Sequence, residues 1–143
     1  GAERMREILF KAKRKDNGKW IEGCYQKRYD LLDNEEHLIF HADSYKVWEY
    51  AEIDPETLCQ FTGLYDKNDK RIWENDIVNT DSNVRAQIKF GLYSNSFSTW
   101  KRNQGFYMDF MNKEYYRSDL GYWAKKTVVI GNIFDNPELA KEE

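Results

Sequence analysis

The chain has few cysteines and no long apolar run, and each shortage excludes a class of protein. The 2 cysteines among 143 residues are too few for a fold held by disulfides, and Cys24 and Cys59 lack the CxxC spacing of a zinc site. We expect two thiols, although the sequence leaves a Cys24–Cys59 bridge open. No segment has the length of a membrane span, and the N-terminus lacks the apolar core of a signal peptide. These absences predict a soluble cytoplasmic protein.

Neither sign of charge dominates the sequence. It has 22 Lys and Arg against 25 Asp and Glu, a formal net charge of -3. Proteins that bind nucleic acid without sequence preference neutralise phosphates with an excess of Lys and Arg, so this balance disfavours that function. The run Lys11, Lys13, Arg14 and Lys15 is still a candidate basic patch. We favour the simpler interpretation that these side chains are solvated at a strand end and turn.

Aromatic residues are abundant instead, at 16% of the chain. Their side chains cover the faces of strands well, which predicts a mainly β (β-rich α+β) protein. The length fits a single domain over 1–143, in which we expect Gly1–Arg4 to be an expression remnant before a native start at Met5. The aromatics assigned to the core are Trp20, Tyr25, Tyr65, Trp73 and Phe90.

Alternating apolar residues and turn-forming residues divide the chain into short strands. Lys15–Gly18 predicts a hairpin, because Asn and Gly readily accept positive φ. Strands are expected at 6–13, 19–27, 58–65, 71–73, 77–78, 84–90, 106–110 and 128–130. Asp54–Pro55 favours one helical turn, 113–126 a helix, and Asn136–Leu139 a short terminal helix. The weakest patterns lie in 28–57 and 91–126, and 28–50 is interpreted as irregular strands and loops.

Three segments carry motifs in a fixed order. They are Met-Arg-Glu-Ile-Leu-Phe-Lys-Ala at 5–12, Thr-Gly-Leu-Tyr-Asp-Lys-Asn-Asp-Lys-Arg-Ile-Trp-Glu-Asn-Asp-Ile-Val at 62–78, and Val-Ile-Gly-Asn-Ile-Phe-Asp-Asn-Pro-Glu-Leu at 129–139. Together they resemble the motifs of the YopX family of phage and prophage proteins. The resemblance implies a β-rich protein of the bacterial host cytoplasm with no established activity. Its Glu-Asn-Asp-Ile-Val segment is similar to the strand entry of SH3-like folds, which extends the expectation to a small, partly open SH3-like barrel of antiparallel hairpins with a short C-terminal helix.

Two positions in the middle motif depart from the family pattern. Asp69 and Asn75 stand where the family has glycine. Asp and Asn are the non-glycine residues that best tolerate the left-handed conformation, which predicts positive φ at both sites. The family-signature residues are accordingly interpreted as structural: Gly63, Asp66, Asp76, Gly131, Asn132 and Pro137.

Residues suited to catalysis or metal binding are few. His37 and His41 have the i, i+4 spacing of a helical metal pair, but their segment is typical of a strand. Glu74 and Asp76 would share a strand face as a carboxylate pair for acid–base chemistry, whereas we favour an Asp76 that accepts hydrogen bonds from turn amides. No phosphate loop or nucleophile motif occurs. We assign no catalytic residue, metal or cofactor.

The polar loop expected at 91–105 carries the candidate binding residues, Tyr93, Phe97, Trp100, Lys101 and Arg102. Exposed aromatics anchor protein interfaces, and beside basic groups they also stack on bases. A loop folded back on its own core is the competing explanation. We predict a non-enzymatic protein-interaction or self-associating module without membrane contact. The alternatives are a small nucleic-acid-binding barrel using Lys11, Lys13, Arg14, Lys101 and Arg102, and a hydrolase-like enzyme using Glu74 and Asp76.

Overall fold

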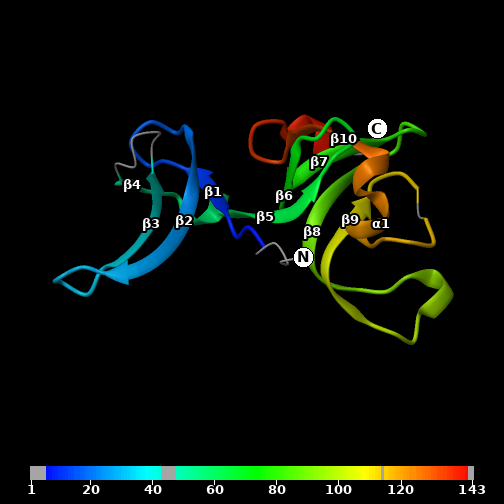
Figure 1. The fold of residues 1–143 in the computed structure, drawn as a ribbon, viewed down its shortest axis with the longest axis horizontal. Coiled ribbons are helices and arrows are strands. Elements are labelled where there is room, and N and C mark those ends of the chain that lie inside the picture. The colour runs from blue at the N-terminus through cyan, green and yellow to red at the C-terminus, as the bar shows by residue number, and fades with distance from the viewer. Residues whose placement is uncertain (1–5, 43–47, 114, 142–143) are drawn as a thin grey trace, which may run out of the picture. The chain divides into compact units, whose positions relative to one another are not determined.

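The chain divides into two units, Gly1–Phe61 and Thr62–Glu143, which Figure 1 draws from blue to red. The structure, a computed structural model, describes residues 6–42, 48–113 and 115–141. Strand β5 (Cys59–Tyr65) begins in the first unit and ends in the second. Each unit has its own cluster of buried apolar residues. The expected remnant Gly1–Arg4 lies outside the described residues, and a single domain over 1–143 stays a prediction.

The first unit is an antiparallel sheet. Its strands are β1 (Phe10–Lys13), β2 (Trp20–Tyr29), β3 (Glu35–Ala42) and β4 (Trp48–Glu52) in the order β4-β3-β2-β1, and β1 also pairs with the start of β5. The predicted hairpin of β1 and β2 is confirmed, with Lys13 opposite Trp20. Its turn holds Gly18 at φ 70°, the left-handed conformation that the Asn-Gly pair indicates.

The prediction of irregular strands and loops over 28–50 needs correction, because the strands that the structure describes there are regular and paired. β2 continues to Tyr29 and returns through a turn at 30–34 into β3. Charged side chains pair across this hairpin, Lys27 with Glu35 at 2.6 Å and Arg28 with Glu36 at 2.8 Å. The strands therefore lack the apolar alternation by which strands are predicted. Residues 43–47 lie outside the described part of the chain.

A small apolar core lies on one face of this sheet. It contains Ala12, Ile21, Ile39, Ala51 and Ile53. Side chains alternate between the two faces of a strand, so Ala51 is buried while both of its neighbours in β4 are exposed. The helical turn predicted at Asp54–Pro55 is confirmed as the 3-10 turn η1 (Pro55–Thr57), in which the Asp54 carboxylate accepts the Glu56 N–H at 3.0 Å.

The second unit also consists mainly of antiparallel strands. These are β6 (Arg71–Trp73), β7 (Asp76–Thr80), β8 (Arg85–Tyr93), β9 (Asn103–Phe110) and β10 (Thr127–Asn132). β6 follows β5, and the others form a sheet in the order β10-β7-β8-β9. Helix α1 (Leu120–Trp123) and the 3-10 turns η2 (Ser96–Ser98), η3 (Ala124–Lys126) and η4 (Pro137–Ala140) complete the unit. Its core comprises Ile72, Val78, Ala86, Ile88, Met108, Leu120, Ala124 and Val129.

Three predictions for this unit need correction. The loop expected at 91–105 is shorter, because β8 and β9 pair as far as Tyr93 opposite Asn103. Of the helix expected over 113–126, the described residues are helical only in α1 and η3, at 120–126. The residues before α1 are held extended against β9, since Met108 donates its N–H to the Ser118 carbonyl at 2.8 Å and Asp119 bridges Tyr107. The terminal helix is a single 3-10 turn, η4.

The described strands form two open antiparallel sheets and no closed barrel. The mainly β class is thereby confirmed, whereas the SH3-like barrel is not. Trp73 is buried as predicted, and Trp20 and Tyr25 are half-buried. The prediction that Tyr65 and Phe90 belong to the core is wrong, because both are exposed. An aromatic at a strand position predicts a face of the sheet but not whether another element covers it.

Both cysteines are thiols. Cys24 is exposed and Cys59 is buried, and the Cys59 Sγ donates to the Thr57 carbonyl at 3.3 Å. The Cys24–Cys59 bridge that the sequence left open is therefore not formed. In the part of the chain that the structure describes, no helix has the length and apolar character needed to cross a membrane.

Candidate interaction surface

The candidate binding residues lie together at the end of one hairpin. β8 and β9 pair from Ala86 opposite Phe110 to Tyr93 opposite Asn103. We call this hairpin, with its loop at 94–102, the β8–β9 arm (Figure 1, green to yellow). Tyr93 ends β8, Phe97 lies in η2, and the loop closes with Trp100, Lys101 and Arg102.

Hydrogen bonds hold the loop of the β8–β9 arm in place. The buried Asn95 accepts the Ser118 N–H with its Oδ1 at 2.8 Å. The Ser96 N–H donates to the Tyr116 carbonyl at 3.0 Å, and the Ser94 hydroxyl donates to the Lys101 carbonyl at 3.0 Å. Asn95 could not be identified from the sequence, because an Asn among serines in a polar loop carries no signal that it is buried.

The loop presents two aromatic rings to solvent. Trp100 is 84% exposed and Phe97 is 58% exposed, although Phe97 also meets the Tyr116 ring edge-on at 6.2 Å between centroids. Tyr93 differs, because it is half-buried and stacks on Tyr107 at 5.4 Å. Phe97 and Trp100 are therefore the loop rings that a partner could contact, whereas Tyr93 packs within the β8–β9 arm.

The arm also exposes apolar strand residues. Phe90 and Leu92 lie on the same face of β8 as the buried Ala86 and Ile88, yet they are 51% and 61% exposed. The core covers only the first half of this face. Phe106 of β9 packs edge-on against Phe90 at 5.0 Å between ring centroids. The β8–β9 arm thus carries apolar surface beyond the end of the core.

A pocket of about 380 Å³ opens on the arm, and we call it the arm pocket. Its walls combine apolar or aromatic side chains with hydroxyl groups, and include Leu92, Tyr93, Tyr107, Phe110, Tyr115, Ser94, Ser96, Thr99 and Ser118. A hollow of about 250 Å³ shares Leu92, Tyr93 and Ser94 with it and is also lined by Arg102. The size and mixed lining suit apolar side chains of a partner. Neither Glu74 nor Asp76 lines the arm pocket.

Charges at the pocket comprise two ion pairs and two loop cations. Asp109 lines the pocket and pairs with Lys89 at 2.6 Å. Arg117 donates from both Nε and Nη2 to the Asp119 carboxylate, at 3.0 and 2.9 Å. Burial alone would raise the pKa of Asp119, but the hydrogen bonds and the charge of Arg117 lower it below its ordinary value. Burial raises the pKa of Tyr93, and the charge of Asp119 adds to this effect. Within the described residues, the exposed side chains of Lys101 and Arg102 have no ion-pair partner.

Asp66 organises the turn that follows β5. Its fully buried carboxylate accepts the N–H of Asn68 at 2.8 Å and of Lys70 at 2.9 Å through Oδ1. Its Oδ2 accepts the Val129 N–H of β10 at 2.9 Å. One side chain therefore ties the middle motif to the closing motif. Gly63, another signature residue, has φ 82° and lies in β5, the strand before this turn.

The positive φ predicted for the two departures from glycine is confirmed. Asp69 has φ 60° and Asn75 has φ 71°. Lys125 donates to the Asp69 carboxylate at 2.8 Å, which lowers the pKa of Asp69. The backbone of Asn75 donates to the Ile88 carbonyl at 2.8 Å and accepts from Ile133 at 3.1 Å. The turn conformation at both sites is compatible with Asp and Asn.

The remaining signature residues contact the backbone or shape turns. Asp76 is buried and accepts the Trp73 N–H at 2.8 Å. Asn132 accepts the N–H groups of Phe134 and Asp135 at 2.9 and 2.8 Å. A Cβ atom at Gly131 would collide with the side chain of Asn136, and Pro137 opens η4. The motifs therefore specify connections between strands.

Comparison with known proteins places these motifs in a family. The family model described as YopX protein matches residues 9–141. The chain belongs to the YopX family. The crystal structure of protein EF1440 from Enterococcus faecalis is similar, with a TM-score of 0.55 and 21% identity over 96% of this chain and 100% of that chain. This likeness shows a shared fold alone. No curated protein matches the sequence.

The basic run of this YopX-family chain is partly neutralised by its neighbours. Arg14 pairs with Asp16 at 2.8 Å and Lys15 with Glu52 at 3.1 Å. Lys11 and Lys13 alternate onto one face of β1 and lie over the ring of Trp20, at 4.7 and 5.4 Å from its centroid. The run therefore presents less uncompensated charge than its sequence indicates.

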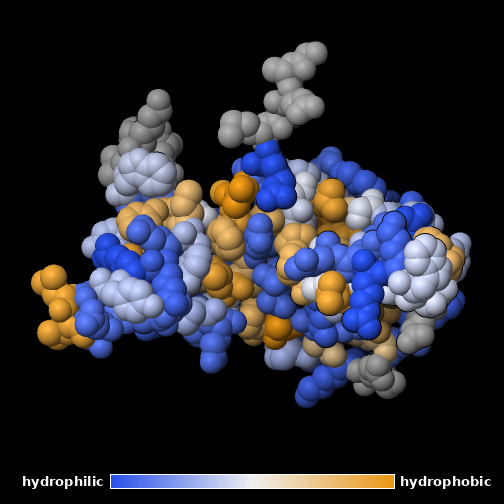
Figure 2. Space-filling model, turned by 90° about the horizontal axis from the view of Figure 1, so that it is seen from below, coloured by the Kyte–Doolittle hydropathy of each residue, from blue (hydrophilic) through white to orange (hydrophobic). Residues whose placement is uncertain are grey.

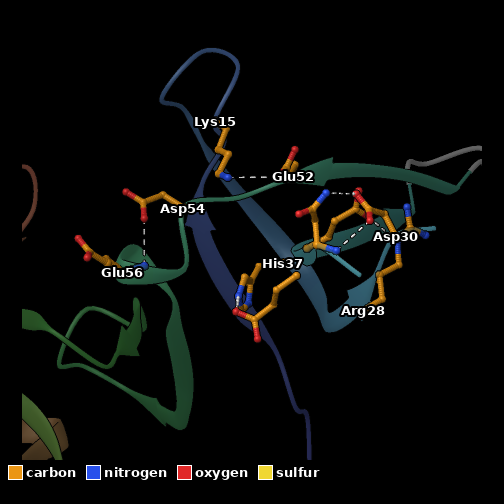
Figure 3. A network of polar contacts seen from close by, with 10 residues as sticks. Lys15, Arg28, Asp30, His37, Glu52, Asp54 and Glu56 are labelled. Carbon is orange, nitrogen blue, oxygen red and sulfur yellow. Dashed lines mark hydrogen bonds and ion pairs between the residues drawn. The ribbon is translucent and has the colours of Figure 1, made fainter. Parts of the chain in front are cut away.

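The two histidines lie on β3. The Nδ1 of His37 lies 2.6 Å from the Tyr25 hydroxyl. Its Nε2 lies 3.1 Å from the Glu35 carboxylate (Figure 3). His41 lies opposite Glu49 of β4. Among the residues that the structure describes, no three His, Cys, Asp or Glu side chains gather to hold a metal ion.

Proposed function

We propose that this YopX-family protein is a phage-encoded, non-enzymatic interaction module of the bacterial host cytoplasm, and that it binds a protein partner through the β8–β9 arm. The observation that carries the proposal is the exposure of Trp100 and Phe97 on a loop fixed by hydrogen bonds. Contiguous exposed apolar surface marks interaction sites, and Trp is among the residues most enriched at interface hot spots.

The order of the loop supports a binding role on energetic grounds. A loop that is already held in one conformation loses little conformational entropy when it binds. The hydrogen bonds of Asn95 and Ser94 fix the loop and leave the rings of Phe97 and Trp100 exposed. Phe90 and Leu92 extend the apolar surface, and Arg102 adds the kind of cation that is enriched at interfaces.

The test is partner capture from the host cell by the tagged full chain, followed by binding measurements with each purified candidate. A Phe97→Ala/Trp100→Ala variant should lose the partner that wild type retains, with affinity reduced by on the order of 30-fold for a hot-spot pair. Trp48→Ala is the matched control, because it removes a Trp that is 65% exposed from β4 in the first unit. Equal capture by wild type and the Phe97/Trp100 variant would remove the arm from the proposal.

Nucleic-acid binding is the second candidate. The side chains of Lys11 and Lys13 over the half-buried Trp20 support it, because an aromatic ring beside cations can stack on unpaired bases. The pairing of Arg14 and Lys15 with carboxylates weakens it. A hydrolase that uses Glu74 and Asp76 has the least support, because the buried Asp76 carboxylate already accepts a backbone N–H.

A further inference from the structure

The turn between β2 and β3 exposes two adjacent leucines. Leu31 is 104% exposed and Leu32 is 82% exposed. Single leucines on a surface are ordinary, but here both leucines occupy the end of a hairpin. Figure 2 shows this end as the orange atoms at the far left, where Figure 1 draws the β2–β3 turn. We call residues 30–34 the hairpin tip.

The hairpin tip is held in one conformation. The Asp30 carboxylate accepts the N–H of Leu32 at 2.8 Å. It also accepts the backbone N–H of Asn34 at 2.9 Å and the Asn34 side-chain amide at 3.2 Å (Figure 3). Asp33 adopts φ 61°, a left-handed conformation that closes the turn. The leucines are therefore presented on a fixed turn, which lowers the entropic cost of binding them.

The tip is apolar at its end and acidic at its base. The strand charges next to the tip are paired, Lys27 with Glu35 and Arg28 with Glu36. Asp30 and Asp33 remain without a cationic partner among the described residues. A binding site for this tip needs apolar walls and a basic rim.

The arm pocket meets both requirements, because its one lining carboxylate, Asp109, is paired with Lys89 at 2.6 Å. Its apolar walls include Leu92 and Tyr107, and Arg102 lines the adjoining hollow. Lys101 lies beside the pocket, because its carbonyl accepts the hydroxyl of the pocket residue Ser94. Lys101 and Arg102 match the two uncompensated carboxylates of the hairpin tip in number and in sign.

We propose that the hairpin tip of one copy of this chain binds in the arm pocket of a second copy, with Leu31 and Leu32 against the apolar walls and Asp30 and Asp33 facing Lys101 and Arg102. The inference rests on the proposed function of the β8–β9 arm and names its partner as the chain itself. The two surfaces in contact are different, so the contact is heterologous and each added copy leaves one tip and one pocket open. Two acidic tips repel each other, which disfavours a symmetric contact between tips.

The test uses two full-length variants in sedimentation velocity, from about 10 µM to about 1 mM, because a contact of this size is weak. Leu31→Ser/Leu32→Ser removes the apolar tip and keeps Asp30 and Asp33. Lys101→Glu/Arg102→Glu reverses the pocket rim. Wild type should grow beyond the dimer with concentration, and each variant alone should stay monomeric, with a dissociation constant at least about 100-fold higher.

Mixing the two variants gives the decisive measurement. The rim variant keeps an intact tip and the tip variant keeps an intact pocket, so the mixture should form a one-to-one dimer and nothing larger. Ile8→Ser is the matched control, since it removes an apolar side chain of the first unit that is 54% exposed and should associate like wild type. Far-UV circular dichroism checks that every variant is folded.

Several outcomes would overturn the inference. These are a wild type that stays monomeric at every concentration, a tip variant that associates like wild type, and a mixture without the dimer. If the tip variant associates normally while Phe97→Ala/Trp100→Ala does not, this inference fails and the proposed function of the arm stands. A different result would assign the leucines to a lipid surface. In that case wild type binds phosphatidylcholine vesicles, the tip variant does not, and the two have the same oligomeric mass.

Discussion

Removing the Asp66 carboxylate should destabilise the second unit more than any exposed substitution. Asp66→Ala leaves three backbone N–H groups without their acceptor, those of Asn68, Lys70 and Val129. The Val129 amide is buried and stays unsatisfied, at a cost of about 1–3 kcal/mol. The two turn amides can partly reach water, so each costs about 0.5–1.5 kcal/mol. The sum is about 4 kcal/mol, a large part of the stability of a typical domain.

Urea unfolding followed by tryptophan fluorescence and far-UV circular dichroism measures this loss as a change in the free energy of unfolding. Asp66→Asn should cost about half as much, since its amide oxygen still accepts while its NH₂ faces a donor. Asp81→Ala is the matched control. Asp81 lies in the turn between β7 and β8 and forms an exposed ion pair with Lys67, so its loss should stay within about 0.5 kcal/mol. A change below about 1 kcal/mol for Asp66→Ala would refute the role given to this carboxylate.

Three further predictions address other parts of the molecule. Asp69→Ala should cost about 1 kcal/mol in urea unfolding, because alanine tolerates φ 60° poorly, whereas Asp69→Gly should stay within about 0.5 kcal/mol; equal losses would contradict the conformational argument. The pKa of Asp119 is lowered in the fold, so its contribution to stability is present above the ordinary value of 3.8 and is lost as the pH falls through the lower folded pKa. Asp119→Asn should therefore flatten the dependence of the melting temperature on pH between pH 5 and pH 2, about one to two units around that value. An unchanged profile would count against the pair with Arg117. In fluorescence titrations at low and moderate salt, the protein should show no saturable binding of single-stranded or double-stranded DNA or RNA, and tight, strongly salt-dependent binding would promote the nucleic-acid alternative.

Local turn chemistry was the part of the fold that could be predicted best. The Asn17-Gly18 pair predicts the first hairpin, and Asp69 and Asn75 adopt the positive φ inferred from their place in the motif. These predictions depend on interactions within a few residues, which a sequence displays directly. The prediction of a helix over the whole of 113–126 is wrong for the opposite reason. Pairing with β9 overrides the helical spacing there, and such pairing joins residues that are distant in the chain.

The candidate surface could be predicted only in part. The sequence grouped Phe97, Trp100, Lys101 and Arg102 by proximity along the chain, and the hairpin keeps them together. It assigned Phe90 to the core, since alternation identifies a face but not the extent of its cover. It gave no role to Leu31 and Leu32, because the charged residues around them resemble a loop.

The sequence by itself determined the family, the mainly β class, and the turns in which Asp, Asn and Gly hold the backbone. These properties follow from motif order and from conformational preferences of single residues, which need no long-range contact. Only the tertiary structure decided that 28–50 contains a paired hairpin, that Asp66 ties β10 to the turn after β5, and which apolar side chains stay exposed. Burial and strand pairing depend on segments that meet from far apart in the chain, so no local pattern can specify them.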